Sequence, residues 1–214
     1  MYSPAEVARR YVETGKSKAA LPVGRMLLLG MLAGAFIALA GGSATFAVSY
    51  GGRLAGAAVF PAGLAMVLLA GSELFTGNCL LVIPLLERQL TWGRMLRSWG
   101  IVYLANVLGA GLVAALTVAA GTFDGVYESV VATAAAKAGL PFLTALLRGV
   151  LCNFLVCIAV WMSLAAQSVP GSWRLCICPS SPLCCADLST AWPICSICRR
   201  GSWRREGTAW RRRG

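Results

Sequence analysis

Four long stretches with almost no charge follow one another along the first 167 positions. They cover residues 26–52, 54–86, 98–121 and 141–167, and the only charges inside them are Glu73 and Arg148. Each exceeds the roughly 20 apolar residues needed to cross a bilayer. Four such lengths leave too little polar surface for a soluble fold. The pattern therefore predicts an all-α, polytopic transmembrane protein with spans near residues 24–50, 54–86, 98–121 and 141–166.

A polar segment precedes the spans and carries four cations, Arg9, Arg10, Lys16 and Lys18. It predicts an amphipathic surface helix within residues 1–21. The loop at 87–97 adds three arginines, whereas the loops after the first and third spans carry few cations. Since short cytoplasmic loops collect Lys and Arg, we expect a multi-pass protein of the inner (plasma) membrane with its N-terminus cytoplasmic and a transmembrane domain over residues 22–167.

The second stretch has an unusual interior. It is too long for one simple span and too short for two spans with a loop, and it contains a glycine-bracketed polar run from Gly71 to Asn78. Small polar residues at helix contacts could account for Ser72 and Gly77, but not for Glu73. An ionisable residue at membrane depth lines a cavity or is buried in protein. The run predicts a broken helix whose half-helix ends point into a pore.

Composition separates the chain into two parts. The 214 residues are 58% hydrophobic and 13% charged, with a mean hydropathy of +0.72 and no histidine, which excludes most soluble classes. The net charge of +11 divides into +5 over residues 1–167 and +6 over 168–214, and six of the nine cysteines lie in the second part. The three others, Cys79, Cys152 and Cys157, lie in apolar spans and are interpreted as packing residues.

Two long motifs resemble the signatures of the formate/nitrite transporter family. The first is AGSELFTGN at residues 70–78, and the second is RGVLCNFLVCIAVWM at residues 148–162. Thr91-Trp92-Gly93 and the spacing of Tyr103, Asn106 and Gly109 also fit. The resemblance covers residues 3–167. It implies an aquaporin-like fold with six spans, of which the second and fifth are broken, and a homopentamer in the lipid bilayer with one pore per protomer.

The resemblance also implies roles for individual residues. Phe60 matches an outer apolar constriction, and Leu64, Leu74, Phe75 and Val156 match the inner constriction and the loop at the break. Thr76 and Asn153 match polar groups facing a central chamber, and Lys137 matches a lysine at the periplasmic approach. Ordinary core packing is the alternative for Phe60, Leu64 and Val156. Asn78 completes the expected pore and substrate residues, while Gly71, Glu73, Gly77 and Arg148 are expected to be structural.

The tail, residues 168–214, departs from the family pattern. The family continues with a fifth broken span carrying a Glu-His-Ser motif, whereas this chain has no histidine. One interpretation is a tail translated in a shifted frame, because the codon junctions from Ala186 to Gly201 permit the string Gly-Phe-Glu-His-Ser. The other is a zinc-binding cytoplasmic tail built on its paired cysteines (Cys176, Cys178, Cys184, Cys185, Cys195 and Cys198).

These observations predict a channel or transporter for small monovalent anions, formate or nitrite, with about four of six spans present. No nucleophile–base pair or cofactor loop appears, so we expect no enzyme, no cofactor and no nucleic-acid partner. Because half of the pore wall is missing, together with the fifth-span histidine that the resemblance implies as a partner of Thr76, Asn153 and Lys137, we expect the 214-residue chain to be inactive or misassembled. The alternative is a four-span membrane anchor with a zinc-binding regulatory tail.

Overall fold

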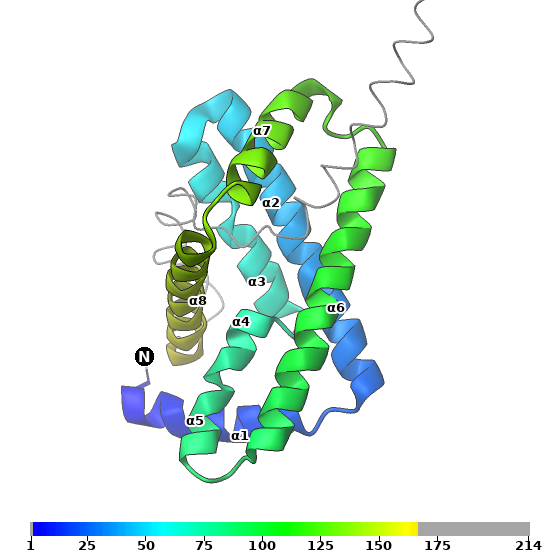
Figure 1. Cartoon of the computed structure of the whole chain (residues 1–214). Coiled ribbons are helices and arrows are strands. Elements are labelled where there is room, and N and C mark those ends of the chain that lie inside the picture. The colour runs from blue at the N-terminus through cyan, green and yellow to red at the C-terminus, as the bar shows by residue number, and fades with distance from the viewer. Residues whose placement is uncertain (1, 167–214) are drawn as a thin grey trace, which may run out of the picture.

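The computed structural model of the chain describes residues 2–166, which form helices almost throughout (Figure 1). The predictions for residues 168–214, including the shifted frame and the zinc-binding tail, lie outside the described residues. In chain order the helices are α1 (Pro4–Ala19), α2 (Val23–Val59), α3 (Pro61–Leu69), α4 (Phe75–Asn78), the 3-10 turn η1 (Cys79–Leu81), α5 (Val82–Leu86), α6 (Trp92–Ala119), the 3-10 turn η2 (Asp124–Val126), α7 (Tyr127–Ala138) and α8 (Phe142–Ala165).

Three continuous helical segments in the described range are long and apolar enough to cross a membrane: Val23–Leu69, Trp92–Ala119 and Phe142–Ala165. The first has 47 residues, which would extend about 70 Å as one straight helix, more than twice the thickness of the hydrocarbon core. It reverses direction instead. Gly52 has a φ of +73° inside α2, and α3 then runs back along α2, where a Cβ on Gly63 would lie 2.5 Å from the Ala40 Cβ (Figure 1).

The shorter apolar helical stretch Phe75–Leu86 follows α3 after an interruption. The structure therefore contains the broken second helix that the sequence predicts, with α3 before the break and α4, η1 and α5 after it. Helix α2 is interrupted at Gly52, so the chain reverses in the interval between the first two predicted spans, of which the first ends near residue 50 and the second begins near residue 54. The fold differs from the predicted spans at one place. Residues 122–140, expected as a loop, contain η2 and α7.

Helices α2 and α6 pack along their length through glycines. A Cβ on Gly34 would overlap the backbone of Asn106, and a Cβ on Gly109 would overlap the backbone of Met31. Small residues allow membrane helices to approach this closely. The consequence for the site is that Asn106, halfway along α6, lies directly against the backbone of α2.

Helix α1 lies across one end of the bundle (Figure 1). Ser3 caps its first turn by accepting a hydrogen bond from the Glu6 N–H, and its inward face buries Val7, Tyr11, Val12, Gly15 and Ala19. Gly15 lies so close to α5 that a Cβ would come within 2.9 Å of the Pro84 Cγ. The Tyr2 N–H donates to the Ala165 carbonyl at 3.0 Å, which joins the start of the chain to the end of α8.

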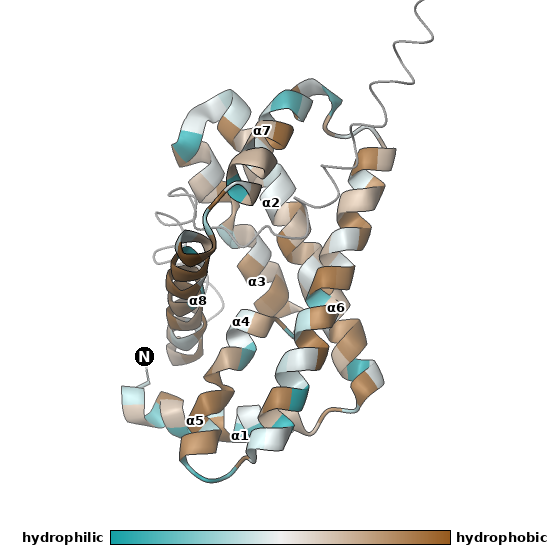
Figure 2. Ribbon diagram, viewed as in Figure 1, coloured by the Kyte–Doolittle hydropathy of each residue, from teal (hydrophilic) through white to brown (hydrophobic). Residues whose placement is uncertain are grey.

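The outward faces of α6 and α8 are apolar and exposed. Figure 2 shows hydrophobic residues over most of α8 and hydrophilic ones concentrated near α1 and α7. These faces fit a hydrocarbon environment, in which backbone groups are bonded within the helix and apolar side chains face outward. The exposed side chains include Leu104, Leu108, Leu112 and Leu116 on α6, and Leu143, Leu147, Val150, Leu151 and Phe154 on α8.

Candidate functional site at the break of the second span

The break begins where α3 stops at Leu69 and the chain turns at Gly71. Gly71 has a φ of +61°, a conformation that favours glycine. The backbone N–H and the hydroxyl of Ser72 both donate to the Val67 carbonyl, each at 3.1 Å, which closes the end of α3. Ser72 and Glu73 are 5% and 4% exposed. The extended segment that follows is therefore buried, and its polar groups need protein partners.

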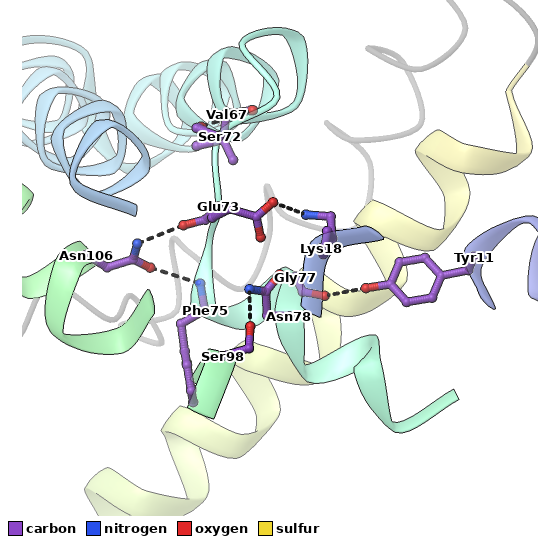
Figure 3. A network of polar contacts seen from close by, with 10 residues as sticks. All are labelled: Tyr11, Lys18, Val67, Ser72, Glu73, Phe75, Gly77, Asn78, Ser98 and Asn106. Carbon is purple, nitrogen blue, oxygen red and sulfur yellow. Dashed lines mark hydrogen bonds and ion pairs between the residues drawn. The ribbon is translucent and has the colours of Figure 1, made fainter. Parts of the chain in front are cut away.

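Asn106 of α6 supplies several of those partners (Figure 3). Its Nδ2 donates to the Glu73 carbonyl at 2.9 Å and to the Gly30 carbonyl of α2 at 2.8 Å. Its Oδ1 accepts from the Phe75 N–H at 2.9 Å. The Glu73 N–H donates to the Leu29 carbonyl at 3.2 Å. A single amide thus bonds the backbone on both sides of Leu74 and links the break to α2 and α6.

The Glu73 carboxylate forms an ion pair with α1. The Lys18 Nζ lies 3.0 Å from the Glu73 Oε1, and the side chains of Lys18 and Glu73 are 26% and 5% exposed. Figure 3 shows the two side chains meeting between the break and α1. A buried carboxylate without a partner is strongly unfavourable, so this pair makes the position of α1 part of the energetics of the break.

Two more residues fix the helical turn after the break. The buried Tyr11 hydroxyl of α1 donates to the Gly77 carbonyl at 3.0 Å (Figure 3), and burial, with the negative charge of Glu73, raises the pKa of Tyr11. The Trp99 Nε1 donates to the Asn78 carbonyl at 2.8 Å. The Asn78 side chain is fully buried and its Nδ2 lies 3.5 Å from the Ser98 Oγ. Asn78 therefore contacts α6.

An apolar cluster lies between α3, the break and α8. Leu64, Ala159 and Val160 form its buried centre. Leu74 and Val156 pack against that centre, as do Leu68, Leu80 and Leu164. Three of the residues expected at an inner constriction, Leu64, Leu74 and Val156, thus lie in one cluster. Phe75 lies apart from it, with its ring packed edge-on against Trp99 and Tyr103.

Polar groups lie beside this cluster. Thr76 in α4 has a buried hydroxyl for which the described residues provide no hydrogen-bond partner. The Cys157 Sγ of α8 donates to the Thr76 carbonyl at 3.1 Å and lies 3.9 Å from the Asn153 Oδ1. The structure thus brings together Thr76 and Asn153, the two residues expected in a chamber, with Cys157 between them.

The remaining candidates lie toward the end of the bundle opposite α1. Phe60 is half-buried at the junction of α2 and α3, Lys137 is half-buried in the last turn of α7, and Arg148 is half-buried near the start of α8. Over residues 2–166, no group of three His, Cys, Asp or Glu side chains could hold a metal ion.

Sequence reasoning missed several residues that the structure places at the site, among them Lys18, Tyr11 and Cys157, and on α6 Ser98 and Trp99. Lys18 and Tyr11 lie in the polar N-terminal segment, and the only signal for Lys18 was the unpartnered Glu73, which required a cation from elsewhere. Cys157 was interpreted as a packing residue. Its position four residues after Asn153 in α8, on the same face of the helix, could have indicated its place in the site.

Comparison with known proteins gives consistent matches over most of the chain. The family described as "Formate/nitrite transporter" matches residues 5–189. An uncharacterized transporter, YrhG of Bacillus subtilis (strain 168), is 39% identical over 179 residues, covering 78% of this chain and 67% of the relative. A probable formate transporter of Methanothermobacter thermautotrophicus is 34% identical over 196 residues, covering 79% and 72%.

The fold is also shared with a solved structure. A pentameric formate channel with formate bound superimposes with a TM-score of 0.71 at 24% identity, over 81% of this chain and 74% of that chain. At that identity the likeness shows the fold, which agrees with the predicted aquaporin-like arrangement and its broken helix. The matched range of the family extends past the last described residue into the tail. This chain is a membrane protein that belongs to the formate/nitrite transporter family.

Proposed function

We propose that the chain lines a transmembrane path for small monovalent anions, formate or nitrite, between α3, the break and α8. The observation that carries this proposal is the buried Thr76 hydroxyl, which has no hydrogen-bond partner among residues 2–166. It lies in the same small region as Asn153 and next to the cluster of Leu64, Leu74 and Val156. A buried hydroxyl without a partner is costly, and an anion would accept its hydrogen bond. The names of the relatives support this class of substrate.

The parts of the site have distinct roles in this path. The apolar cluster acts as the inner constriction, because an apolar passage strips water and excludes strongly hydrated ions. Phe60 forms the outer constriction. Lys137 and Arg148 lie toward the same end as Phe60, where positive charge raises the local concentration of anions. The contacts of Asn78 with Ser98 and Trp99 favour a structural role, so we leave Asn78 out of the path.

The same proposal includes the assembly and its orientation. A homopentamer with one path per protomer fits the exposed apolar faces of α6 and α8 and the pentameric channel that shares the fold. The excess of cations in α1 and in the loop at 87–97 supports a cytoplasmic N-terminus in the inner membrane. In this proposal the chain with its reading frame restored works as a channel or transporter rather than as an enzyme.

Formate uptake into proteoliposomes tests the path. The protein is the 214-residue chain and, separately, the product of a gene whose reading frame is restored after codon 168. The sequence predicts no flux from the first and selective formate flux from the second. Thr76→Val should lower that flux several-fold. Thr45→Val is the matched control, because the Thr45 hydroxyl bonds to its own helix at Gly41. Folded protein without formate-selective flux in either chain would contradict the path.

A further inference from the structure

Two cysteines from separate elements lie on one wall of the proposed path. Cys79 is the first residue of η1, directly after α4, and Cys157 lies in the second half of α8. Both thiols are reduced and half-buried. The third cysteine of the described residues, Cys152, is buried and lies five positions before Cys157, on a different face of α8.

The two thiols point toward the same group of atoms. The Cys157 Sγ donates to the Thr76 carbonyl at 3.1 Å, and the Cys79 Sγ donates to the carbonyl of the neighbouring Phe75 at 3.4 Å. The Cys157 Sγ also lies 3.9 Å from the Asn153 Oδ1. The two thiols thus bond to the carbonyls of consecutive residues, Phe75 and Thr76. Since S–H groups are weak donors, these bonds position the thiols without protecting them from a stronger ligand.

We propose that Cys79 and Cys157 form a two-thiolate site for a soft metal ion, with the mercuric ion as its strongest ligand. Thiolates are the preferred ligands of soft ions. The mercuric ion accepts linear two-coordination, so two thiolates complete its coordination without a further ligand. Binding breaks two S–H bonds, forms two S–Hg bonds and releases two protons to water, with no oxidation or reduction. Two thiolates and one divalent ion give a neutral product.

That neutrality distinguishes this site from other metal sites. Inside a membrane protein an uncompensated charge is expensive, so cuprous or silver ions, which leave the pair with a net negative charge, should bind less tightly than the mercuric ion. Zinc requires four ligands. The described residues offer two thiols with neutral oxygens from Asn153 and the Thr76 backbone, so zinc should not compete.

Bound metal would join η1 to α8 beside Thr76 and Asn153. If the proposed path is correct, this bridge obstructs it, so mercury should block anion flux at one site per protomer. The binding itself does not depend on transport. A protein that binds mercury through both cysteines but carries no anion would contradict the proposed function and leave this site intact.

The test measures mercury retained by the purified full-length chain in the presence of excess free cysteine, which removes singly bound mercury. The reference protein carries serine at the tail cysteines so that they do not contribute. The replaced residues are Cys176, Cys178, Cys184, Cys185, Cys195 and Cys198. We expect one mercury per chain, the loss of two titratable thiols, and no change on addition of zinc.

Cys79→Ser and Cys157→Ser should each weaken retention by at least about tenfold, since the second thiolate acts at high effective concentration. Cys152→Ser is the matched control and should retain mercury like the reference protein. Retention unchanged in Cys79→Ser, or two mercury ions on two independent thiols, would overturn the proposal. Size-exclusion profiles identify any variant that misfolds. If Cys79→Ser misfolds, Cys79→Ala takes its place. If Cys157→Ser misfolds, the result is decided by the two variants at Cys79.

Discussion

Of the three glycines with positive φ in the described residues, Gly52 and Gly71 interrupt the chain's first apolar helices, and the two interruptions differ in what surrounds them. At Gly52, the next residues, Arg53 and Leu54, are exposed, and the chain reverses at the end of the bundle. At Gly71, the next residues, Ser72 and Glu73, are buried. The first turn depends on the backbone freedom of glycine. The second depends on side chains from α1 and α6 that bond the freed backbone and the carboxylate.

The difference shows how a membrane protein can place irregular backbone between its spanning helices. Near the end of the bundle, water can satisfy the backbone groups that a turn releases. Within the bundle the protein must supply each partner, and here the partners come from elements far away in the sequence: Lys18 and Tyr11 before the break and Ser98, Trp99 and Asn106 after it. The break is thus a tertiary feature, whereas the turn at Gly52 is a local one.

The largest effect should come from separating α2 and α6. In Gly34→Ala the new Cβ overlaps the backbone of Asn106, so the two helices must move apart and the Asn106 amide leaves the break. We expect loss of the folded protein, measured as yield of monodisperse protein in detergent. Gly100→Ala on α6 is the control, because a Cβ there meets nothing within 4 Å. Normal yield from Gly34→Ala would contradict the close approach.

Removing Lys18 should have the next largest effect. Lys18→Met leaves the Glu73 carboxylate buried without its ion pair, which should cost about 3–5 kcal/mol of unfolding free energy, measured by titration with sodium dodecyl sulfate. The double variant Lys18→Met, Glu73→Gln should recover a large part of that loss, because no unpaired charge remains. Lys16→Met is the control, since Lys16 and its partner Glu13 are exposed. If Lys16→Met and Lys18→Met lowered the free energy of unfolding equally, the break at Gly71 would not depend on its buried ion pair. The proposed difference from the turn at Gly52 would then fail.

Asn106→Leu tests the backbone partners of the break. The substitution leaves the Glu73 and Gly30 carbonyls and the Phe75 N–H without their hydrogen bonds. Membrane hydrogen bonds average about 0.6 kcal/mol each and unsatisfied groups cost more, so we expect about 2–4 kcal/mol. Ser49→Ala, near the Gly52 turn, should change stability by less than about 0.5 kcal/mol. Similar values for both variants in the same titration would contradict the proposed dependence on side-chain partners.

The sequence alone could predict the break but not the side chains that bond to it. Glu73 between glycines in an apolar stretch already required an interruption, because an ionisable residue at that depth needs a cavity or a partner. The motif resemblance grouped Leu64, Leu74, Phe75 and Val156, of which Leu64, Leu74 and Val156 pack in the apolar cluster. The Phe75 ring packs against Trp99 and Tyr103 instead. In contrast, Lys18 lies 55 residues from Glu73, and nothing in its local sequence distinguishes it from Lys16.

The turn at Gly52 lies in the short interval that the sequence leaves between the first two predicted spans, at residues 51–53. Gly51, Gly52 and Arg53 interrupt the apolar pattern there, so hydropathy located the reversal but not the positive φ of Gly52. Helix α7 was missed because its charged residues Glu128 and Lys137, with Asp124 in the preceding η2, indicate a loop at the membrane surface. Its alanines fit an exposed helix equally well. Charge patterning reports where the chain meets water, and the backbone conformation there depends on packing.

The smallest effects should come from the two glycines themselves. Gly52 combines a φ of +73° with a ψ of −176°, a region that essentially only glycine populates, so Gly52→Ala should cost about 1–3 kcal/mol. Gly71→Ala should cost about 1 kcal/mol, as expected for a side chain at positive φ with no atom of the described residues within 4 Å.

Asparagine tolerates positive φ better than alanine, so Gly71→Asn should be close to the unmodified protein. Gly52→Asn should remain destabilised, since its ψ lies outside the region that asparagine adopts. If Gly71→Ala proved more costly than Gly52→Ala, the buried break would depend on its glycine more than on Asn106 and Lys18, and the distinction between a local turn and a tertiary break would fail.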